Sequence, residues 1–228
     1  MPIHLQREIN LLNRLILQMG GQVEENLRHA LLALRNRDAS RSAEMHQRDD
    51  LVNRLEIRVE ESCLKILALH QPVASDLRYI VAIMKINNEL ERIGDLSEHI
   101  GRRAAHLAHQ IYPPFPGAID EMSTLTRDML RQSLDAMVKL QIEPCRQILE
   151  MDKRVDTCNA DVQKWFGEEA RKHNDQTLDF CIHTLLTARE LERIGDHVCN
   201  IAEDVIYLVS GEIIRHMEQD EAGSSRQN

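Results

Sequence analysis

One seven-residue segment occurs twice in this chain, and its repetition constrains the fold more than any other feature. Residues 89–95 read Glu-Leu-Glu-Arg-Ile-Gly-Asp, and residues 190–196 repeat them letter for letter, 101 residues further on. Upstream, residues 49–53 (Asp-Asp-Leu-Val-Asn) match residues 152–156 (Asp-Lys-Arg-Val-Asp) at nearly the same spacing. Similarity at a fixed period indicates an internal duplication, so the sequence predicts two halves with the same structure.

The pattern of apolar residues predicts that both halves are helical. Apolar side chains recur at spacings of three and four almost throughout, beginning with Leu5, Ile9, Leu12 and Ile16. Nine glycines, six prolines and 3% aromatic residues are too few for a chain of many strands and turns. The predicted helices cover about 5–36, the stretch from a polar break at 36–40 to about 70, 75–111, 118–140, 145–172 and 175–210.

The boundary between the halves is predicted at a proline-rich segment. Residues 113–117 read Pro-Pro-Phe-Pro-Gly, which cannot continue a helix, and the chain has no other stretch as dense in Pro and Gly. We therefore expect an all-α protein made of two tandem, pseudo-symmetric antiparallel three-helix bundles. The expected segments are a first unit at 1–112, a linker at 113–117, a second unit at 118–211 and a C-terminal tail at 212–228.

Composition excludes several classes of function. The formal net charge of -9, from 37 acidic and 28 basic residues, disfavours nucleic acid as a partner, because that role needs clustered positive charge. The five cysteines are scattered without a Cys-x-x-Cys pair, which is typical of reduced cytosolic thiols. The sequence contains neither a signal-like N-terminal segment nor an apolar run of about 20 residues. It predicts a cytoplasmic protein without membrane insertion.

Each half places acidic residues on facing positions of two predicted helices. Asp49 interrupts an otherwise apolar stripe, as does its counterpart in the second half, and an Asn or Asp follows one turn later. Within the repeated heptapeptide, the second Glu and the Asp are four residues apart and therefore share a helix face. The candidate metal ligands are Asp49, Asn53, Glu91 and Asp95 in the first half, and Asp152, Asp156, Glu192 and Asp196 in the second.

Carboxylates gathered between helices repel one another and lose hydration, and a divalent cation relieves both penalties. Oxygen ligands suit hard ions such as Mg, Mn, Ca or iron, and bridging carboxylates could hold two ions about 3.5–4 Å apart. Gly94 belongs to a track of small residues that would let another helix approach these acids. His99 and His197 are secondary candidates as ligands or donors. The alternative is that Arg92 and Arg193 pair with the acids on solvated helix faces.

The doubled heptapeptide resembles the PhoU family, as do residues 70–78 (His-Gln-Pro-Val-Ala-Ser-Asp-Leu-Arg) and 200–203 (Asn-Ile-Ala-Glu). The resemblance extends from the first helix to Gly211. It implies two three-helix bundles, a homodimer and negative regulation of phosphate uptake and of the phosphate-starvation response. The implied partners are the ATPase subunit of the phosphate ABC transporter and a sensor histidine kinase. It also implies multinuclear metal on the eight positions above, with Fe, Mn, Mg, Zn or Ni as the candidate metals.

Three classes of function remain to be compared. A regulator that acts by docking is favoured, and the chain is expected not to be an enzyme. A di-metal carboxylate oxidase would need Glu-x-x-His pairs, and none of the eleven histidines has Glu three positions before it. A structural adaptor that binds no metal stays open. A dimer is also expected because the first helix carries more apolar residues than one bundle can cover.

Overall fold

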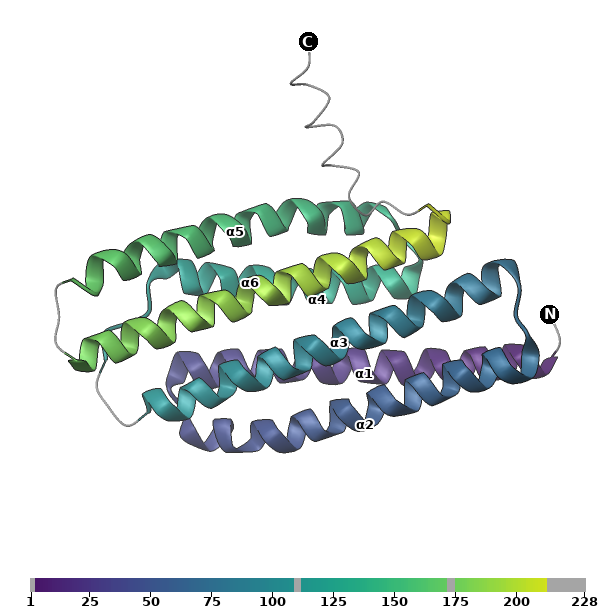
Figure 1. Ribbon diagram of the computed structural model, residues 1–228, viewed down its shortest axis with the longest axis horizontal. Helices are drawn as coiled ribbons and strands as arrows, with labels where there is room; N and C mark the ends of the chain where they lie inside the picture. Colours follow the sequence, from purple (N-terminus) through teal and green to yellow (C-terminus); the bar gives the residue numbers. More distant parts are fainter. Residues whose placement is uncertain (1–2, 109–111, 172–174, 213–228) are drawn as a thin grey trace, which may run out of the picture.

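The computed structural model describes residues 3–108, 112–171 and 175–212, and this part of the chain contains six helices and no strand (Figure 1). The helices are α1 (Ile3–Asn36), α2 (Ala39–His70), α3 (Ala74–Leu107), α4 (Gly117–Lys139), α5 (Glu143–Glu169) and α6 (Asp175–Ser210). The prediction of an all-α fold is confirmed.

The six helices form two bundles packed against each other. Helices α1, α2 and α3 contact one another, and α4, α5 and α6 do the same. Figure 1 shows the two groups as stacked layers of long, nearly antiparallel helices, with α3 next to α6. The α3–α6 contact joins the bundles, and a smaller contact joins α1 to α4. This arrangement confirms the predicted tandem of three-helix bundles.

Several helix ends differ from the predicted ones. Helix α3 ends at Leu107 instead of continuing to about 111, and residues 109–111 lie outside the described part. Helix α5 begins at Glu143 because Pro144 fits the first turn, where its missing N–H removes no helical hydrogen bond. It ends at Glu169, before the predicted 172. Gly117, expected in the linker, is the first residue of α4. The predicted tail lies outside the described residues except for Glu212.

The short connections within each bundle have local causes. Asp38 caps α2 by accepting hydrogen bonds from the backbone N–H of Ser40 at 3.0 Å and of Arg41 at 3.2 Å. Gln71 ends α2 in the left-handed conformation with φ of 44°, and Leu140 ends α4 in the same way with φ of 52°. These turns reverse the chain within a few residues, which places neighbouring helices antiparallel.

One continuous apolar core runs through both bundles, with members from all six helices. At the α1–α4 contact, Gly20 provides space for the neighbouring helix, since a Cβ there would lie 2.7 Å from Leu134 Cδ2. All five cysteines are free thiols, and four of them are buried. No helix among the described residues has an apolar stretch long enough to cross a membrane.

Candidate functional site

The first-half acids lie between α2 and α3, around the buried Asp49. This side chain is only 5% exposed, and its Oδ2 accepts a hydrogen bond of 2.9 Å from Asn53 Nδ2. Its Oδ1 is buried and has no hydrogen-bond partner among the described residues. Burial raises the pKa of Asp49, and the negative charge of Asp95 raises it further. Asp49 is therefore a carboxylate with one unsatisfied oxygen in a place that disfavours its ionised form.

Glu91 and Asp95 face Asp49 from α3. Burial raises the pKa of Glu91, with Asp95 as the next cause, while Arg92 opposes the rise. Arg92 Nε lies 3.4 Å from Glu91 Oε2, and Arg92 Nη1 lies 3.7 Å from Asp95 Oδ2. The ion pairs of the alternative interpretation are thus present in this half. Because the Arg92 side chain is 61% exposed, such pairs add little stability.

Two further acids belong to the first-half set, and sequence reasoning missed them. The charge of Glu56 on α2 raises the pKa of Glu91, and that of Glu98 on α3 raises the pKa of Asp49. Glu98 Oε1 also lies 3.4 Å from Nδ1 of the exposed His46. Their spacing in the sequence could have indicated them, because each lies one turn or less from a candidate ligand on the same helix. The repeat concealed them, since the second half has Asn159 and Cys199 at the matching positions.

The second-half acids form a more strongly coupled set between α5 and α6. Burial raises the pKa of Asp152 to about 6, and the charges of Asp156 and Asp196 contribute. The Cys199 thiol donates a hydrogen bond to Asp152 and opposes this rise. The pKa values of Glu192 and Asp196 are also raised, by burial first and then by neighbouring carboxylates, among them Asp156. All four predicted residues of this half therefore act on one another electrostatically.

The glycine of each heptapeptide brings its helix against the central aspartate. A Cβ on Gly94 would lie 3.2 Å from Val52 Cγ1 and 3.4 Å from Asp49 Oδ1. A Cβ on Gly195 would lie 2.6 Å from Asp152 Oδ1. The structure thus confirms the prediction that small residues allow the close approach of a second helix to the acids.

The first glutamate of each heptapeptide has a different role from the other acids, because its side chain binds residues of the other bundle. Oε2 of Glu89, on α3, lies 2.7 Å from Nδ1 of His197 on α6. The same oxygen accepts a hydrogen bond of 3.1 Å from Asn200 Nδ2, also on α6. Glu190, on α6, accepts hydrogen bonds from Nε and Nη2 of Arg103 on α3, at 3.0 and 2.6 Å. His99 Nδ1 lies 3.8 Å from Glu190. The two secondary histidine candidates thus contact these interface glutamates.

The chemistry of both acid sets fits a hard divalent cation. The donors are carboxylate and amide oxygens, one buried oxygen lacks a partner, and the second set holds four mutually repelling carboxylates. As placed, however, no three of these acids have ligand atoms within 4.8 Å of one another. Among the described residues, that convergence occurs once, at His106, Asp179 and His183.

Sequence reasoning did not find this group. The spacing of Asp179 and His183, four residues apart on one helix, was the available signal. Their meeting with His106 depends on how α3 packs against α6, which the sequence pattern does not show.

Comparison with known proteins places the chain in one family. A family model described as PhoU domain matches residues 16–104 and 119–205, one match in each bundle. Relatives named phosphate-specific transport system accessory protein PhoU include that of Serratia marcescens, 34% identical over 205 residues, covering 90% of this chain and 84% of the relative. That of Escherichia coli (strain K12) is 34% identical over 218 residues, covering 94% and 88%.

Solved structures agree with this assignment. The crystal structure of PhoU from Pseudomonas aeruginosa matches with a TM-score of 0.84 and 32% identity, covering 91% of this chain and 99% of that one. The phosphate transport system regulatory protein PhoU from Streptococcus pneumoniae matches with a TM-score of 0.83 and 27% identity, covering 92% and 99%. The relatives are named accessory proteins, which agrees with the expectation that the chain is not an enzyme. The chain belongs to the PhoU family.

Proposed function

We propose that this protein is a cytoplasmic, non-enzymatic negative regulator of phosphate uptake and of the phosphate-starvation response. It acts by docking on the ATPase subunit of a phosphate ABC transporter and on a phosphate sensor histidine kinase. The observation that carries the proposal is the similarity over 90% of the chain to accessory proteins of phosphate-specific transport systems. Two matched PhoU domains and a common fold support it.

The acid sets are proposed to bind divalent ions, with Asp152, Asp156, Glu192 and Asp196 as the tighter site. Burial first, and then the charges of Asp156 and Asp196, raise the pKa of Asp152 to about 6. This supports the assignment, because a bound cation would offset both penalties. In the first half, Asn53 already satisfies one oxygen of Asp49. Arginines offset part of the charge in both halves, Arg92 in the first and Arg189 and Arg193 in the second. A bound ion would neutralise the carboxylates, and the residues themselves would draw α5 and α6 together around it.

Exposed apolar side chains support docking to protein partners and a homodimer. On α2, Leu51, Ile57 and Leu64 are 42%, 53% and 51% exposed, and Leu11 and Leu17 on α1 are 47% and 42% exposed. Such residues on a long helix supply the apolar area that a partner or a second copy of the chain would cover.

The function is tested by affinity purification of the tagged full chain from phosphate-replete and phosphate-starved cells. We expect the transporter ATPase subunit and the sensor kinase to co-purify, and deletion of the gene to derepress a starvation-induced phosphatase under replete conditions. The proposal fails if deletion leaves phosphatase activity unchanged in both conditions and neither partner co-purifies. The dimer is tested separately by light scattering, which should return about twice the 26.3 kDa chain mass.

A structural adaptor without metal is the second candidate, and the Arg92 ion pairs favour it in the first half. Metal analysis of protein purified without chelator separates the two. The adaptor is supported if manganese, iron, magnesium, zinc and nickel are all absent and none of them changes the melting temperature.

A further inference from the structure

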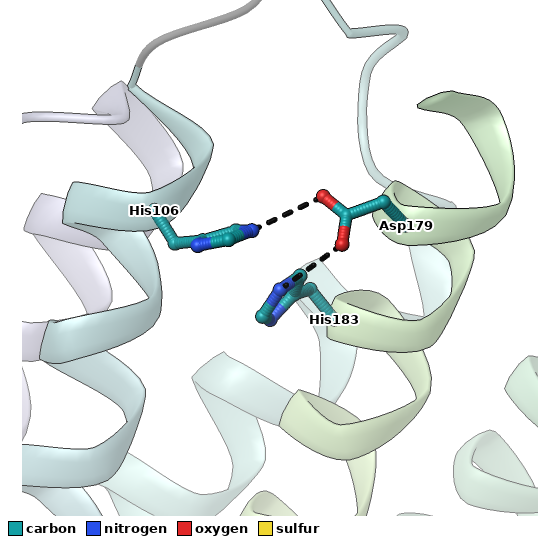
Figure 2. Close-up of side chains that lie close together, drawn as sticks. All are labelled: His106, Asp179 and His183. Atoms are coloured by element: carbon teal, nitrogen blue, oxygen red, sulfur yellow. Dashed lines mark hydrogen bonds and ion pairs between the residues drawn. The ribbon is translucent and has the colours of Figure 1, made fainter. Parts of the chain in front are cut away.

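Three side chains that suit a metal ion meet at the interface between the bundles, away from both acid sets. His106 lies in the last turn of α3, and Asp179 and His183 lie one turn apart on α6. His106 Nε2 is 3.1 Å from Asp179 Oδ2, and His183 Nε2 is 3.6 Å from Asp179 Oδ1. Figure 2 shows both imidazole rings directed at the carboxylate between them.

The spacing of these atoms is close to what a small cation requires. One ligand atom from each residue lies within 4.8 Å of the other two. Bonds of about 2.0–2.2 Å around a tetrahedral ion would place its ligands roughly 3.3–3.6 Å apart. The two nitrogen–oxygen distances of 3.1 and 3.6 Å, each to a different oxygen of Asp179, lie close to this range. Side-chain rotations would bring the three ligand atoms around one ion.

The carboxylate between the rings is held in position by its surroundings. Tyr112 Oη donates a hydrogen bond of 3.1 Å to Asp179 Oδ2. The neighbouring Phe180 is fully buried and stacks on the Tyr112 ring with centroids 5.2 Å apart. Outer hydrogen bonds and packing of this kind orient ligands before an ion arrives.

The three residues can be reached from solvent. The side chains of His106, Asp179 and His183 are 54%, 40% and 18% exposed. Both histidines line a groove of about 450 Å³ together with His99, Arg103 and Glu190. Arg103 Nη1 lies 3.5 Å from His183 Nδ1, but Glu190 holds its guanidinium through two hydrogen bonds and offsets its charge. The Nε2 of His183, on the side of Asp179, remains available.

We infer that His106, Asp179 and His183 bind a divalent transition-metal ion such as Zn²⁺ or Co²⁺, with at least one coordination position open to water. Two imidazoles and one carboxylate are ligands for borderline metals, whereas the acid sets offer oxygen alone. Because His106 belongs to the first bundle and the other two residues to the second, the ion would join α3 to α6.

Zn²⁺ and Co²⁺ titrations of the chelator-treated full chain test this site. To remove binding by the tighter acid set, the reference protein carries Asp156→Asn and Asp196→Asn. The Zn²⁺ affinity is measured by competition with a chromophoric chelator. We expect the reference protein to bind Zn²⁺ and His106→Ala to lower its affinity about 10-fold or more. His99→Ala is the matched control, because His99 lies on α3 and lines the same groove outside the group of three; it should change affinity less than about twofold.

A spectroscopic measurement separates this site from oxygen-only binding. Pulsed EPR of one equivalent of Cu²⁺ should show imidazole nitrogen couplings that His106→Ala reduces. His106 is half-exposed at a helix end, so this variant should fold, and circular dichroism checks that it does. The inference is overturned if His106→Ala leaves both the Zn²⁺ affinity and the nitrogen signal unchanged. The inference is supported if the nitrogen signal persists in the reference protein with Asp156→Asn and Asp196→Asn. Either outcome is independent of the proposed role in phosphate regulation.

Discussion

The two acid sets descend from one repeat, yet they distribute their charges differently. In the first half an amide, Asn53, donates to the central Asp49, while acids stand further along both helices at Glu56 and Glu98. In the second half these roles are exchanged. Asp156 stands where the first half has Asn53, and the positions matching Glu56 and Glu98 hold Asn159 and Cys199.

This exchange changes how the buried charge of the central aspartate is compensated. Asp49 receives an amide hydrogen bond within its own helix, which partly offsets its burial. Asp152 receives a hydrogen bond from the Cys199 thiol and has a carboxylate one turn away, and its pKa rises to about 6. At the centre of the second half, burial and carboxylate repulsion therefore together penalise the ionised aspartate, and a bound cation would offset both.

The largest expected effect is the difference in metal response between the halves. Saturating Mn²⁺ at about 100 times its dissociation constant should stabilise the protein by about 2.7 kcal/mol. For a chain of this size, that corresponds to a rise in melting temperature of roughly 5–10 °C. Asp196→Asn should reduce the rise more than its first-half counterpart Asp95→Asn, as measured by differential scanning fluorimetry with and without Mn²⁺. An equal reduction by both variants would contradict the ranking of the two sites.

The next effect concerns the metal-free protein. Asp152→Asn removes the charge but keeps an oxygen that can accept from Cys199, so it should raise the melting temperature in chelator at pH 7.5 by about 2–4 °C. Asp49→Asn should raise it less, because the Asn53 amide already compensates the charge of Asp49. Strong destabilisation by Asp152→Asn would mean that this carboxylate is a required member of an ion pair.

A third comparison uses the two glycines. Gly195→Ala would push the Asp152 carboxylate aside, because the new Cβ would lie 2.6 Å from Asp152 Oδ1. Gly94→Ala would instead press mainly on the branched side chain of Val52, at 3.2 Å. We expect Gly195→Ala to lower Mn²⁺ affinity several-fold with a stability change within about 1 kcal/mol, since alanine also favours the helix. Isothermal titration and thermal melts measure both quantities, and unchanged affinity would place Asp152 outside the site.

The smallest expected effect is the part of the pH dependence that His29 adds in the first bundle. Burial lowers the pKa of His29 below its usual 6.5, and the charges of Arg48 and Arg41 lower it further. A histidine that folds in its neutral form contributes stability above pH 6.5 that is lost as the pH falls. The repeat has Gln132 at the matching position, so His29→Gln should flatten the loss between pH 7 and 5. Parallel melting curves for wild type and variant would contradict this.

The sequence predicted the helices, the duplication and the central acids because each depends on local spacing along one helix. Asp49 and Gly94 could be paired across helices only because the same residues recur at Asp152 and Gly195. The repeat was misleading where the halves differ, which is why Glu56 and Glu98 were missed. His106, Asp179 and His183 depend on the angle and register between the bundles, and the apolar pattern of single helices carries no information about either.

The reciprocal glutamates at the α3–α6 interface have a consequence for communication between the bundles. Glu89 and Glu190 each lie two residues before an acid of their own bundle and bind side chains of the other. A shift of α3 or α6 that tightens one acid set therefore also moves a glutamate that is bonded to the other bundle. Any coupling free energy between the two ion sites must be equal in both directions, so filling one would change the affinity of the other by the same factor.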